Sequence, residues 1–326
     1  MNEIVKASPG EIVGALDVHN LVSSFLASLD VRDITKKAYK NGLERFLGWM
    51  SSNGITQPDR RSILGFKAFL VGSKLAANTV NSYLVAVKKF FAYLEGMRKY
   101  PNVAKDIKGI AQPRGHLRES LTIAQIKDLL CGIDAATFQG RRDFAIINLM
   151  ARTGLRTIEV VRANIEDIKQ EGGEAILYVH GKGRDSKDAF VLLTEKAQRP
   201  ILAYLKERGQ GSPAGDPLFA SISDRNKGGR LTTRTIRQMI KGGLRKINIE
   251  SRKLSAHSLR HSFATIALRA GAPLLQVKDA LRHSSIETTE KYLHNIERIE
   301  KGAERFVDFW DGQDRGSIPR KPVYCQ

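Results

Sequence analysis

Apolar residues recur every three or four positions along most of this 326-residue chain, a spacing that predicts amphipathic helices. Four such patterns occupy the first hundred residues, at about 18–29, 35–53, 59–72 and 78–95. We expect Thr35 to cap the second helix and Gly54 to end it. Four helices in so short a segment predict a small helical bundle over residues 18–100, after a flexible lead-in over residues 1–17.

The helical periodicity breaks after residue 100, where proline and glycine interrupt a basic segment. Pro101, Gly109, Pro113 and Gly115 all fall within residues 101–118. Residues of this kind punctuate regular structure, and domain boundaries commonly fall in such segments. We therefore predict an interdomain linker over residues 101–118.

A second domain is expected over residues 119–300. Thr122 and Gln125 are spaced to form a capping box at its first helix. Helices are predicted at about 123–132, 141–152, 194–208 and 232–246, on both sides of residues 271–273, around Tyr292 and at about 295–311. Residues 301–326 would form the rest of a C-terminal helix and a tail.

The period changes between residues 164 and 193. Three short, branched and partly alternating segments lie there, at 164–170, 176–182 and 187–193, separated by glycine-containing turns. They predict a three-stranded antiparallel meander. The expected fold is therefore mainly α with a small antiparallel sheet, in which an all-helical N-terminal domain precedes a mixed α/β domain.

The charge balance indicates a class of partner. Fifty-three Lys and Arg against 34 Asp and Glu leave a formal net charge of +19. A protein with this field attracts polyanions, of which nucleic acid is the commonest. An anionic membrane surface would be attracted too, but no lipid-binding amphipathic helix or lipidation motif supports that alternative.

The cysteines and the first residues indicate a compartment. Cys131 and Cys325 are the only cysteines, so no disulfide framework is expected and a reducing environment is favoured. The first residues lack the basic and apolar regions of a secretory signal, and no apolar run approaches the ~20 residues of a membrane span. We expect a cytoplasmic protein.

Residues 257–294 carry more reactive groups than helix formation requires. His257 and Arg260 are three residues apart and can point at one target, while His283 and Tyr292 follow later in the segment. His261 is expected to be a structural residue of the core. Each of these side chains alone has an ordinary structural explanation.

Two further candidates lie upstream. Arg156 follows a Thr-Gly turn at a helix entrance, with Glu159 placed to orient its guanidinium, and Lys182 lies at the tip of the second and third strands. Together the arginines can neutralise a phosphodiester, the lysine and histidines can move protons, and Tyr292 can act as a nucleophile. The cluster lacks metal-ligand spacing, so we predict metal-free phosphoryl transfer on nucleic acid.

Three segments carry a resemblance to a known family: TGLRTIEV at 153–160, HGKGR at 180–184, and residues 257–294. At these segments the chain resembles the tyrosine recombinases, also called the phage integrase family, with the Xer recombinases a close match in pattern. The resemblance covers about residues 18–300. It implies a four-helix, SAM-like core-binding domain followed by a tyrosine recombinase catalytic domain.

The resemblance also implies roles for the candidate residues. Tyr292 would attack the scissile phosphate, form a 3′-phosphotyrosyl link and release a 5′-hydroxyl. Arg156 and Arg260 would bind the non-bridging oxygens. The remaining roles would be protonation of the leaving oxygen by Lys182, acid/base chemistry by His257, a hydrogen bond from His283 to the phosphate, and support from Glu159. No cofactor is required, because the phosphotyrosine conserves the bond energy.

The family's DNA contacts would come from residues 231–246, which resemble a helix that enters the major groove. We expect a base contact from Arg234, with Arg230, Arg237 and Lys241 on or near phosphates. The chain departs from the family's Leu-Gly-His at Leu281-Arg282-His283. The turn must then form without glycine, and Arg282 is expected to touch the DNA backbone.

The resemblance implies a strand exchange through a Holliday junction on double-stranded DNA with inverted-repeat core sites. The partners would form a homotetramer, or a heterotetramer with a related recombinase. The apolar residues Ile296, Ile299, Phe306, Val307 and Trp310 would dock on a neighbouring protomer or fold back on their own domain. Two alternatives are a type IB topoisomerase and a catalytically idle DNA-binding protein of the same fold.

Overall fold

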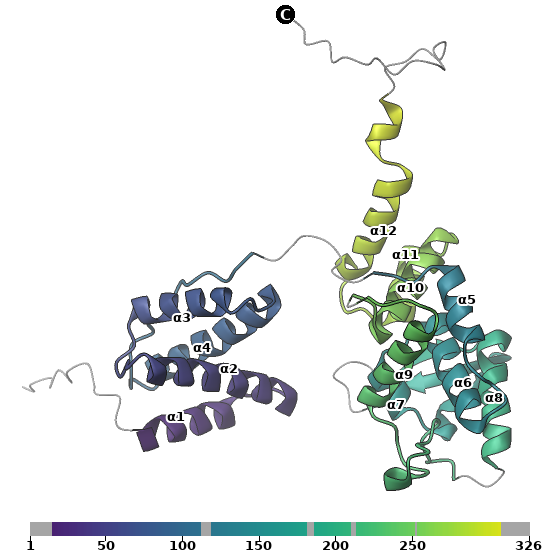
Figure 1. Ribbon diagram of the computed structural model, residues 1–326, viewed down its shortest axis with the longest axis horizontal. Coiled ribbons are helices and arrows are strands. Elements are labelled where there is room, and N and C mark those ends of the chain that lie inside the picture. Colours follow the sequence, from purple (N-terminus) through teal and green to yellow (C-terminus); the bar gives the residue numbers. More distant parts are fainter. Residues whose placement is uncertain (1–14, 112–118, 181–185, 210–212, 252, 308–326) are drawn as a thin grey trace, which may run out of the picture. The chain divides into compact units, whose positions relative to one another are not determined.

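The computed structural model describes residues 15–111, 119–180, 186–209, 213–251 and 253–307. The chain divides into two compact units, Met1–Gly115 and His116–Gln326, and each is considered by itself (Figure 1). No helix in these described ranges is long and apolar enough to cross a membrane. Lys182 and Trp310 lie outside the described residues.

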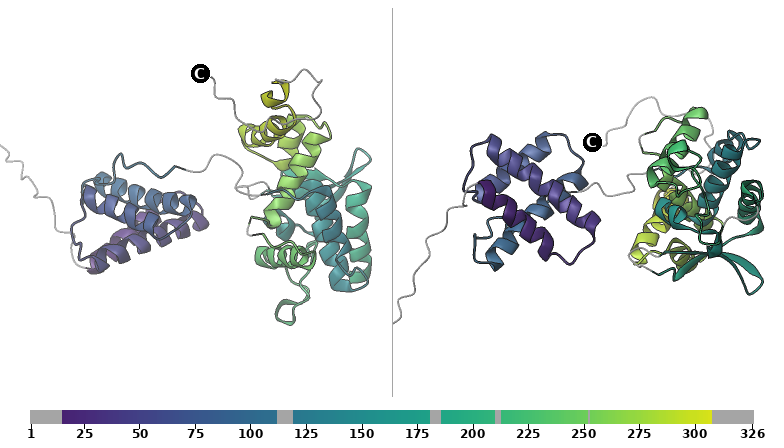
Figure 2. Two further views of the ribbon diagram at one scale, coloured as in Figure 1. Left: turned by 45° about the horizontal axis from the view of Figure 1, so that its top comes forward. Right: turned by 90° about the horizontal axis from the view of Figure 1, so that it is seen from below.

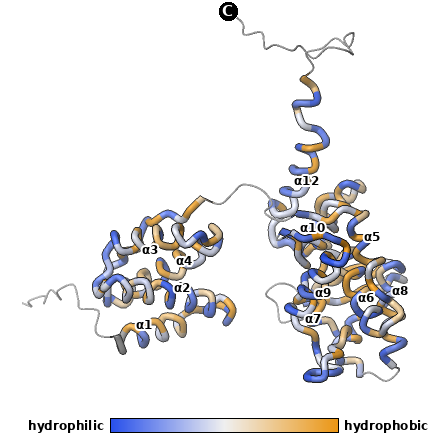
Figure 3. Tube along the Cα trace, in the orientation of Figure 1, coloured by the Kyte–Doolittle hydropathy of each residue, from blue (hydrophilic) through white to orange (hydrophobic). Residues whose placement is uncertain are grey.

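The N-terminal unit is the helical bundle expected from the sequence. Its helices are α1 (Ala15–Ser28), α2 (Asp33–Ser52), α3 (Arg60–Gly72) and α4 (Ala77–Gly96), which cross one another in Figure 2. Apolar side chains gather between them, with Phe25, Phe46, Phe66 and Phe91 almost fully buried. The mixture of hydrophobic and hydrophilic residues along each helix is visible in Figure 3.

The start of α2 differs from the prediction. Arg32, not Thr35, is the N-cap residue, and the Thr35 N–H donates to the Arg32 carbonyl at 2.8 Å. Thr35 therefore already lies in the first turn, since the chain becomes helical at Asp33. The end is closer to the prediction: the helix stops at Ser52, and Gly54 turns the chain away with φ of 63°.

The N-terminal unit extends past the expected boundary at residue 100. Ala104 and Ile107 are buried in its core. The Asn81 side chain donates to the Ile110 carbonyl at 3.0 Å and accepts from the Ile110 N–H at 2.8 Å. Residues 101–110 are therefore packed structure and not linker, because burial of apolar side chains continues after α4 ends at Gly96.

The C-terminal unit combines eight described α-helices with a small sheet that lies at its edge (Figures 1 and 2). They are α5 (Ile123–Cys131), α6 (Phe138–Thr153), α7 (Thr157–Arg162), α8 (Glu195–Arg208), α9 (Thr233–Lys246), α10 (Ala256–Arg269), α11 (Leu274–Leu281) and α12 (Glu287–Glu300). The predicted capping box of α5 is present: the Thr122 side chain accepts from the Gln125 N–H, and the Gln125 side chain accepts from the Thr122 N–H.

The predicted antiparallel meander is confirmed. Strands β1 (Ile168–Glu171), β2 (Glu174–Val179) and β3 (Ala189–Leu192) pair in that order. Ile168 lies opposite Leu177, and Tyr178 lies opposite Phe190. Leu177, Val179 and Val191 enter the main core of the unit, so the expected mainly helical fold with a small sheet is correct.

The C-terminal helix differs from the predicted one. Tyr292 lies within α12, which is continuous to Glu300 and is followed by a short 3-10 helix, Ala303–Phe306. The helix expected over residues 295–311 is therefore correct only for residues 295–300, which form the end of α12, because the chain leaves α-helical geometry at Lys301 and Gly302. Ile296 is buried, whereas Ile299 and Phe306 are 63% and 83% exposed.

Burial of Ile107 predicts a stability effect that a linker residue would not have. Ile107→Ala should lower the free energy of unfolding of the N-terminal unit by about 2–5 kcal/mol, because it removes buried methyl groups and leaves a cavity. The matched control is Ile34→Ala at a residue that is 76% exposed, where about 0.5 kcal/mol or less is expected.

Denaturant unfolding followed by Trp49 fluorescence, in a Trp310→Phe background, measures this difference. Trp49 packs in the N-terminal core and reports on that unit. Equal stabilities of the two alanine variants would contradict the packing of residues 101–110.

Candidate active site

Helix α10 holds Arg260 at the centre of the site. Arg260 is almost completely buried, and its guanidinium donates to two backbone carbonyls, from Gly154 at 2.7 Å and from Leu281. Burial, reinforced by the positive charge of Arg156, lowers the pKa of Arg260 to about 9. The group is still a cation at neutral pH, and its bonded acceptors are neutral.

The turn before α7 brings Arg156 to the same place. Gly154 ends α6 with φ of 65°, and a Cβ there would lie 2.7 Å from Leu281 Cδ2 and 2.8 Å from Phe263 Cδ1. Only glycine combines this backbone conformation with so close an approach. Arg156 follows as the N-cap residue of α7 and donates to Glu159 Oε1 at 2.7 Å. Glu159 therefore contacts the guanidinium that the sequence suggested it would orient.

Arg282 makes the turn without glycine that the sequence required. It ends α11 in the left-handed region, with φ of 54° and ψ of 48°. Its carbonyl accepts from Arg156 Nη2 at 3.5 Å. Its own guanidinium donates to Glu159 Oε2 at 2.7 Å and to the Ala280 carbonyl at 2.6 Å.

These contacts hold the Arg282 side chain inside the unit. It is only 8% exposed because it is paired with the buried carboxylate of Glu159. The sequence identified this position as a departure from the family's pattern but did not indicate the ion pair. The expected contact of Arg282 with the DNA backbone stays a prediction.

Glu159 is the carboxylate shared by Arg156 and Arg282. Burial raises the pKa of Glu159, but the charge and hydrogen bond of Arg282, followed by the contacts with Arg156, outweigh it and hold the pKa below its usual value. Three guanidinium groups, counting Arg260, thus surround one ionised carboxylate. The excess positive charge makes the place suited to an anion with two or more oxygen acceptors.

His283 and Tyr292 lie beside these arginines. The rings are parallel within 7°, with centroids 6.4 Å apart, and His283 Nδ1 is 2.9 Å from Thr289 Oγ1. Burial and the charge of Arg260 lower the pKa of His283 to about 4, so the imidazole is neutral at pH 7. Burial raises the pKa of the Tyr292 hydroxyl against the opposing effect of Arg260 and Arg156.

The position of His261 next to Tyr292 was not evident from the sequence. It is buried, as expected for a core residue, but its ring lies 5.0 Å from the His257 ring and 5.1 Å from the Tyr292 ring. The i,i+4 spacing of the two histidines on α10 could have indicated their contact. The approach of Tyr292 could not, because it depends on the packing of α12 against α10.

The expected DNA-contacting residues divide into two groups. Arg234, Arg237 and Lys241 are exposed on α9, whose opposite face buries Ile236 and Ile240. Arg230 differs, because its guanidinium is bound within the unit. It donates to the carbonyls of Val161 and Ala163 at 2.7 and 3.3 Å and to Asn164 Oδ1 at 2.7 Å.

Sequence comparisons cover both units of the chain. The family profile described as "Phage integrase family" matches residues 119–298, and the one described as "Phage integrase, N-terminal SAM-like domain" matches residues 23–96. The tyrosine recombinase XerD of Listeria monocytogenes is 30% identical over 85% of this chain and 94% of its own length. For the tyrosine recombinase XerD of Pseudomonas putida these values are 31%, 86% and 94%.

Solved structures share the fold. A XerH site-specific recombinase bound to a palindromic difH substrate superposes with a TM-score of 0.70 at 23% identity, covering 92% of this chain and 91% of that one. The Tn1549 transposon integrase with transposon right-end DNA gives a TM-score of 0.67 at 18% identity, covering 88% and 98%. With the family profiles matching both units, these findings show that the chain belongs to the phage integrase family, the tyrosine recombinases.

Proposed function

We propose that this protein is a site-specific recombinase of double-stranded DNA that cleaves and rejoins strands through Tyr292. The observation that carries the proposal is the convergence of Arg156 and Arg260 beside Tyr292, with more positive charge than the single carboxylate of Glu159 balances. A scissile phosphate between the two arginines would receive hydrogen bonds on its non-bridging oxygens. Those oxygens gain charge in the transition state, so fixed donors there lower the barrier.

The proposed step exchanges one phosphoester for another. The Tyr292 oxygen attacks phosphorus while the bond to the 5′-oxygen breaks, which leaves a 3′-phosphotyrosyl link and a 5′-hydroxyl. His257 takes the phenol proton and Lys182 supplies a proton to the leaving oxygen. Rejoining is the reverse attack by a 5′-hydroxyl, so no external energy source is needed.

We assign His283 the role of a neutral hydrogen-bond donor to the phosphate. Its low pKa favours the uncharged ring at pH 7. The contact between Nδ1 and Thr289 Oγ1 fixes one ring nitrogen, and when the hydroxyl donates in this contact the proton is on Nε2. The other nitrogen is then available to a phosphate oxygen without adding to the charge of three nearby arginines.

We further propose that DNA is recognised by α9 and by the N-terminal unit. Arg234 on the exposed face of α9 would contact a base, and Arg237 and Lys241 would contact phosphates. Arg230 would support this face through its hydrogen bonds to the backbone carbonyls of Val161 and Ala163.

Strand exchange through a Holliday junction requires several protomers on one DNA, as a homotetramer or with a related recombinase. The exposure of Ile299, Phe306 and Val307 supports docking of the C-terminal segment on a neighbouring protomer over folding back on its own unit. Such partner exchange would distinguish this protein from a type IB topoisomerase. We place its action in the cytoplasm.

The nucleophile assignment predicts a covalent complex. The wild-type protein, mixed with a nicked duplex that carries its recombination site, should give a protein–DNA adduct that survives a denaturing gel. Tyr292→Phe should give none, because the attacking oxygen is missing. Tyr93→Phe, which changes a partly buried tyrosine of the N-terminal core, should behave as wild type. An adduct formed by Tyr292→Phe would exclude Tyr292 as the nucleophile.

The ion pair between Glu159 and Arg282 predicts a pH-dependent stability effect. Because the folded pKa of Glu159 lies below its unfolded value of about 4.5, its contribution is full well above pH 4.5 and is lost as pH falls through the folded pKa. Arg282→Met should therefore lower the free energy of unfolding by about 1.5–3 kcal/mol at pH 7, and by less at acid pH. Urea unfolding at a series of pH values measures this.

Arg282→Gly separates the ion pair from the backbone turn. Glycine adopts the left-handed conformation without strain but cannot pair with Glu159. Equal pH-dependent losses in the glycine and methionine variants would assign the effect to the charge. A glycine variant as stable as wild type at pH 7 would contradict the importance of the ion pair.

A further inference from the structure

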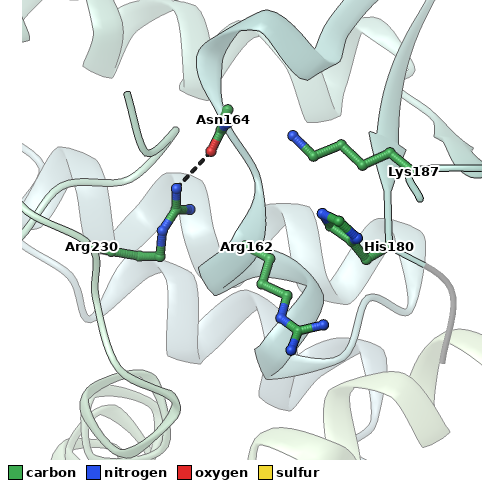
Figure 4. Close-up of a pocket in the computed structure, with 5 residues that line it drawn as sticks. All are labelled: Arg162, Asn164, His180, Lys187 and Arg230. Carbon is green, nitrogen blue, oxygen red and sulfur yellow. Dashed lines mark hydrogen bonds between the residues drawn. The ribbon is translucent and has the colours of Figure 1, made fainter. Parts of the chain in front are cut away.

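A positively charged pocket lies outside the catalytic residues of the C-terminal unit. It is an open pocket of about 310 Å³, lined by Arg162, Asn164, His180, Lys187 and Arg230. Figure 4 shows Arg230 and Asn164 joined by a hydrogen bond, facing Lys187 and His180 across the pocket, with Arg162 below. The five residues come from the end of α7, the chain after it, the position directly after β2, the chain before β3, and the segment before α9.

The pocket contains a rigid cation whose charge is not neutralised. All three acceptors of the Arg230 guanidinium are neutral: the carbonyls of Val161 and Ala163 and the amide oxygen of Asn164. These bonds fix the position of the group while leaving its full positive charge. A fixed guanidinium loses little side-chain entropy when it binds an anion.

The other pocket residues retain binding capacity. In the described part of the chain no hydrogen bond or ion pair occupies the exposed Arg162 guanidinium, and the buried Nδ1 of His180 has no hydrogen-bond partner. Lys187 donates to Asp167 at 2.6 Å, which leaves two of its three N–H donors. The lining holds the three cations Arg162, Lys187 and Arg230. The carboxylates bonded to lining residues are Asp167, paired with Lys187, and Glu166, which accepts from Asn164 Nδ2 at 3.2 Å, so positive charge is in excess.

We propose that this pocket binds a backbone phosphate of the DNA substrate other than the scissile one. The chemistry of the lining, with forked guanidinium groups and an ammonium, suits a phosphodiester. The inference rests on the proposed function, since it requires that DNA lie on this unit. A DNA phosphate in the pocket would be the partner of Arg162, which has none within the described part of the protein.

The position of the pocket fits a phosphate close to the cleavage point. Arg156 caps the start of α7 and Arg162 ends it. Six residues of helix rise about 9 Å, and one DNA strand rises about 3.4 Å per nucleotide. A phosphate a few nucleotides from the scissile one would therefore lie within reach of the pocket. Holding it would fix the register of the strand relative to Tyr292.

The test compares the salt dependence of DNA binding among matched variants. Binding to a mixed-sequence duplex is measured over a range of salt concentrations in a Tyr292→Phe background, so that cleavage plays no part. Arg162→Gln should reduce the slope of log K against log salt by about 0.9, the value for one phosphate contact. Arg162→Lys should retain the slope because it retains the charge.

The control is Arg199→Gln, which removes the same charge from an exposed position on α8. It should leave the slope unchanged. An unchanged slope in Arg162→Gln, or equal reductions in Arg162→Gln and Arg199→Gln, would overturn the pocket assignment. Failure of the parent protein to bind the duplex at all would instead overturn the proposed function, and the pocket assignment with it.

A second arm separates DNA phosphate from free phosphate. Thermal unfolding is compared in inorganic phosphate and in chloride at matched ionic strength, for the parent protein and Arg162→Gln. We expect no difference between the two proteins, because one free phosphate lacks the rest of the DNA to hold it in place. Stabilisation by phosphate that Arg162→Gln abolishes, with an unchanged DNA slope, would make the pocket a site for a free anion and overturn the proposal.

Discussion

The left-handed turn at Arg282 is the constraint on which the catalytic end of the C-terminal unit depends. It directs two consecutive carbonyls at guanidinium groups, since Leu281 accepts from Arg260 and Arg282 accepts from Arg156. The side chain at the turn folds back onto Glu159. The single residue thereby connects α7, α10 and α11, and His283 follows it directly. A change in this turn would move both arginines and the histidine together.

The excess positive charge around that turn favours the binding of an anion such as phosphate. Glu159 balances only part of the charge of Arg156, Arg260 and Arg282, and the pKa of Arg260 falls to about 9 through burial and the nearness of Arg156. Buried charge without a counter-charge costs folding free energy. A phosphodiester bound there would supply the missing negative charge, and its transition state would supply more. The same repulsion that destabilises the protein alone would then favour the transition state over the ground state.

Much of the fold could be predicted because the chain marks its helices locally. The apolar positions of α4 repeat at three and four, and Thr122 with Gln125 forms the box that begins α5. The errors arose where local signals compete with packing. Pro101 and Gly109 indicated a linker, but Ile107 between them is buried in the core, and a helix break says nothing about where apolar side chains go.

The site shows the same division between local and distant contacts. The three-residue spacing of Arg156 and Glu159 allowed their contact to be predicted. The partner of Arg282 could not be, because Glu159 lies 123 residues earlier in the chain and no spacing connects them. The stacking of Tyr292 against His283 likewise required the placement of α12. Sequence suggested candidate reactive residues, and the fold shows which side chains and carbonyls hold them in place.

Backbone carbonyls perform most of that holding. Arg260 bonds to the carbonyls of Gly154 and Leu281, Arg156 to that of Arg282, and Arg230 to those of Val161 and Ala163. A carbonyl is present whatever the side chain, so these anchors depend on the path of the chain and not on its composition. This dependence on the path of the chain explains why Gly154 is constrained, since a Cβ there would push away the segment that supplies the acceptors.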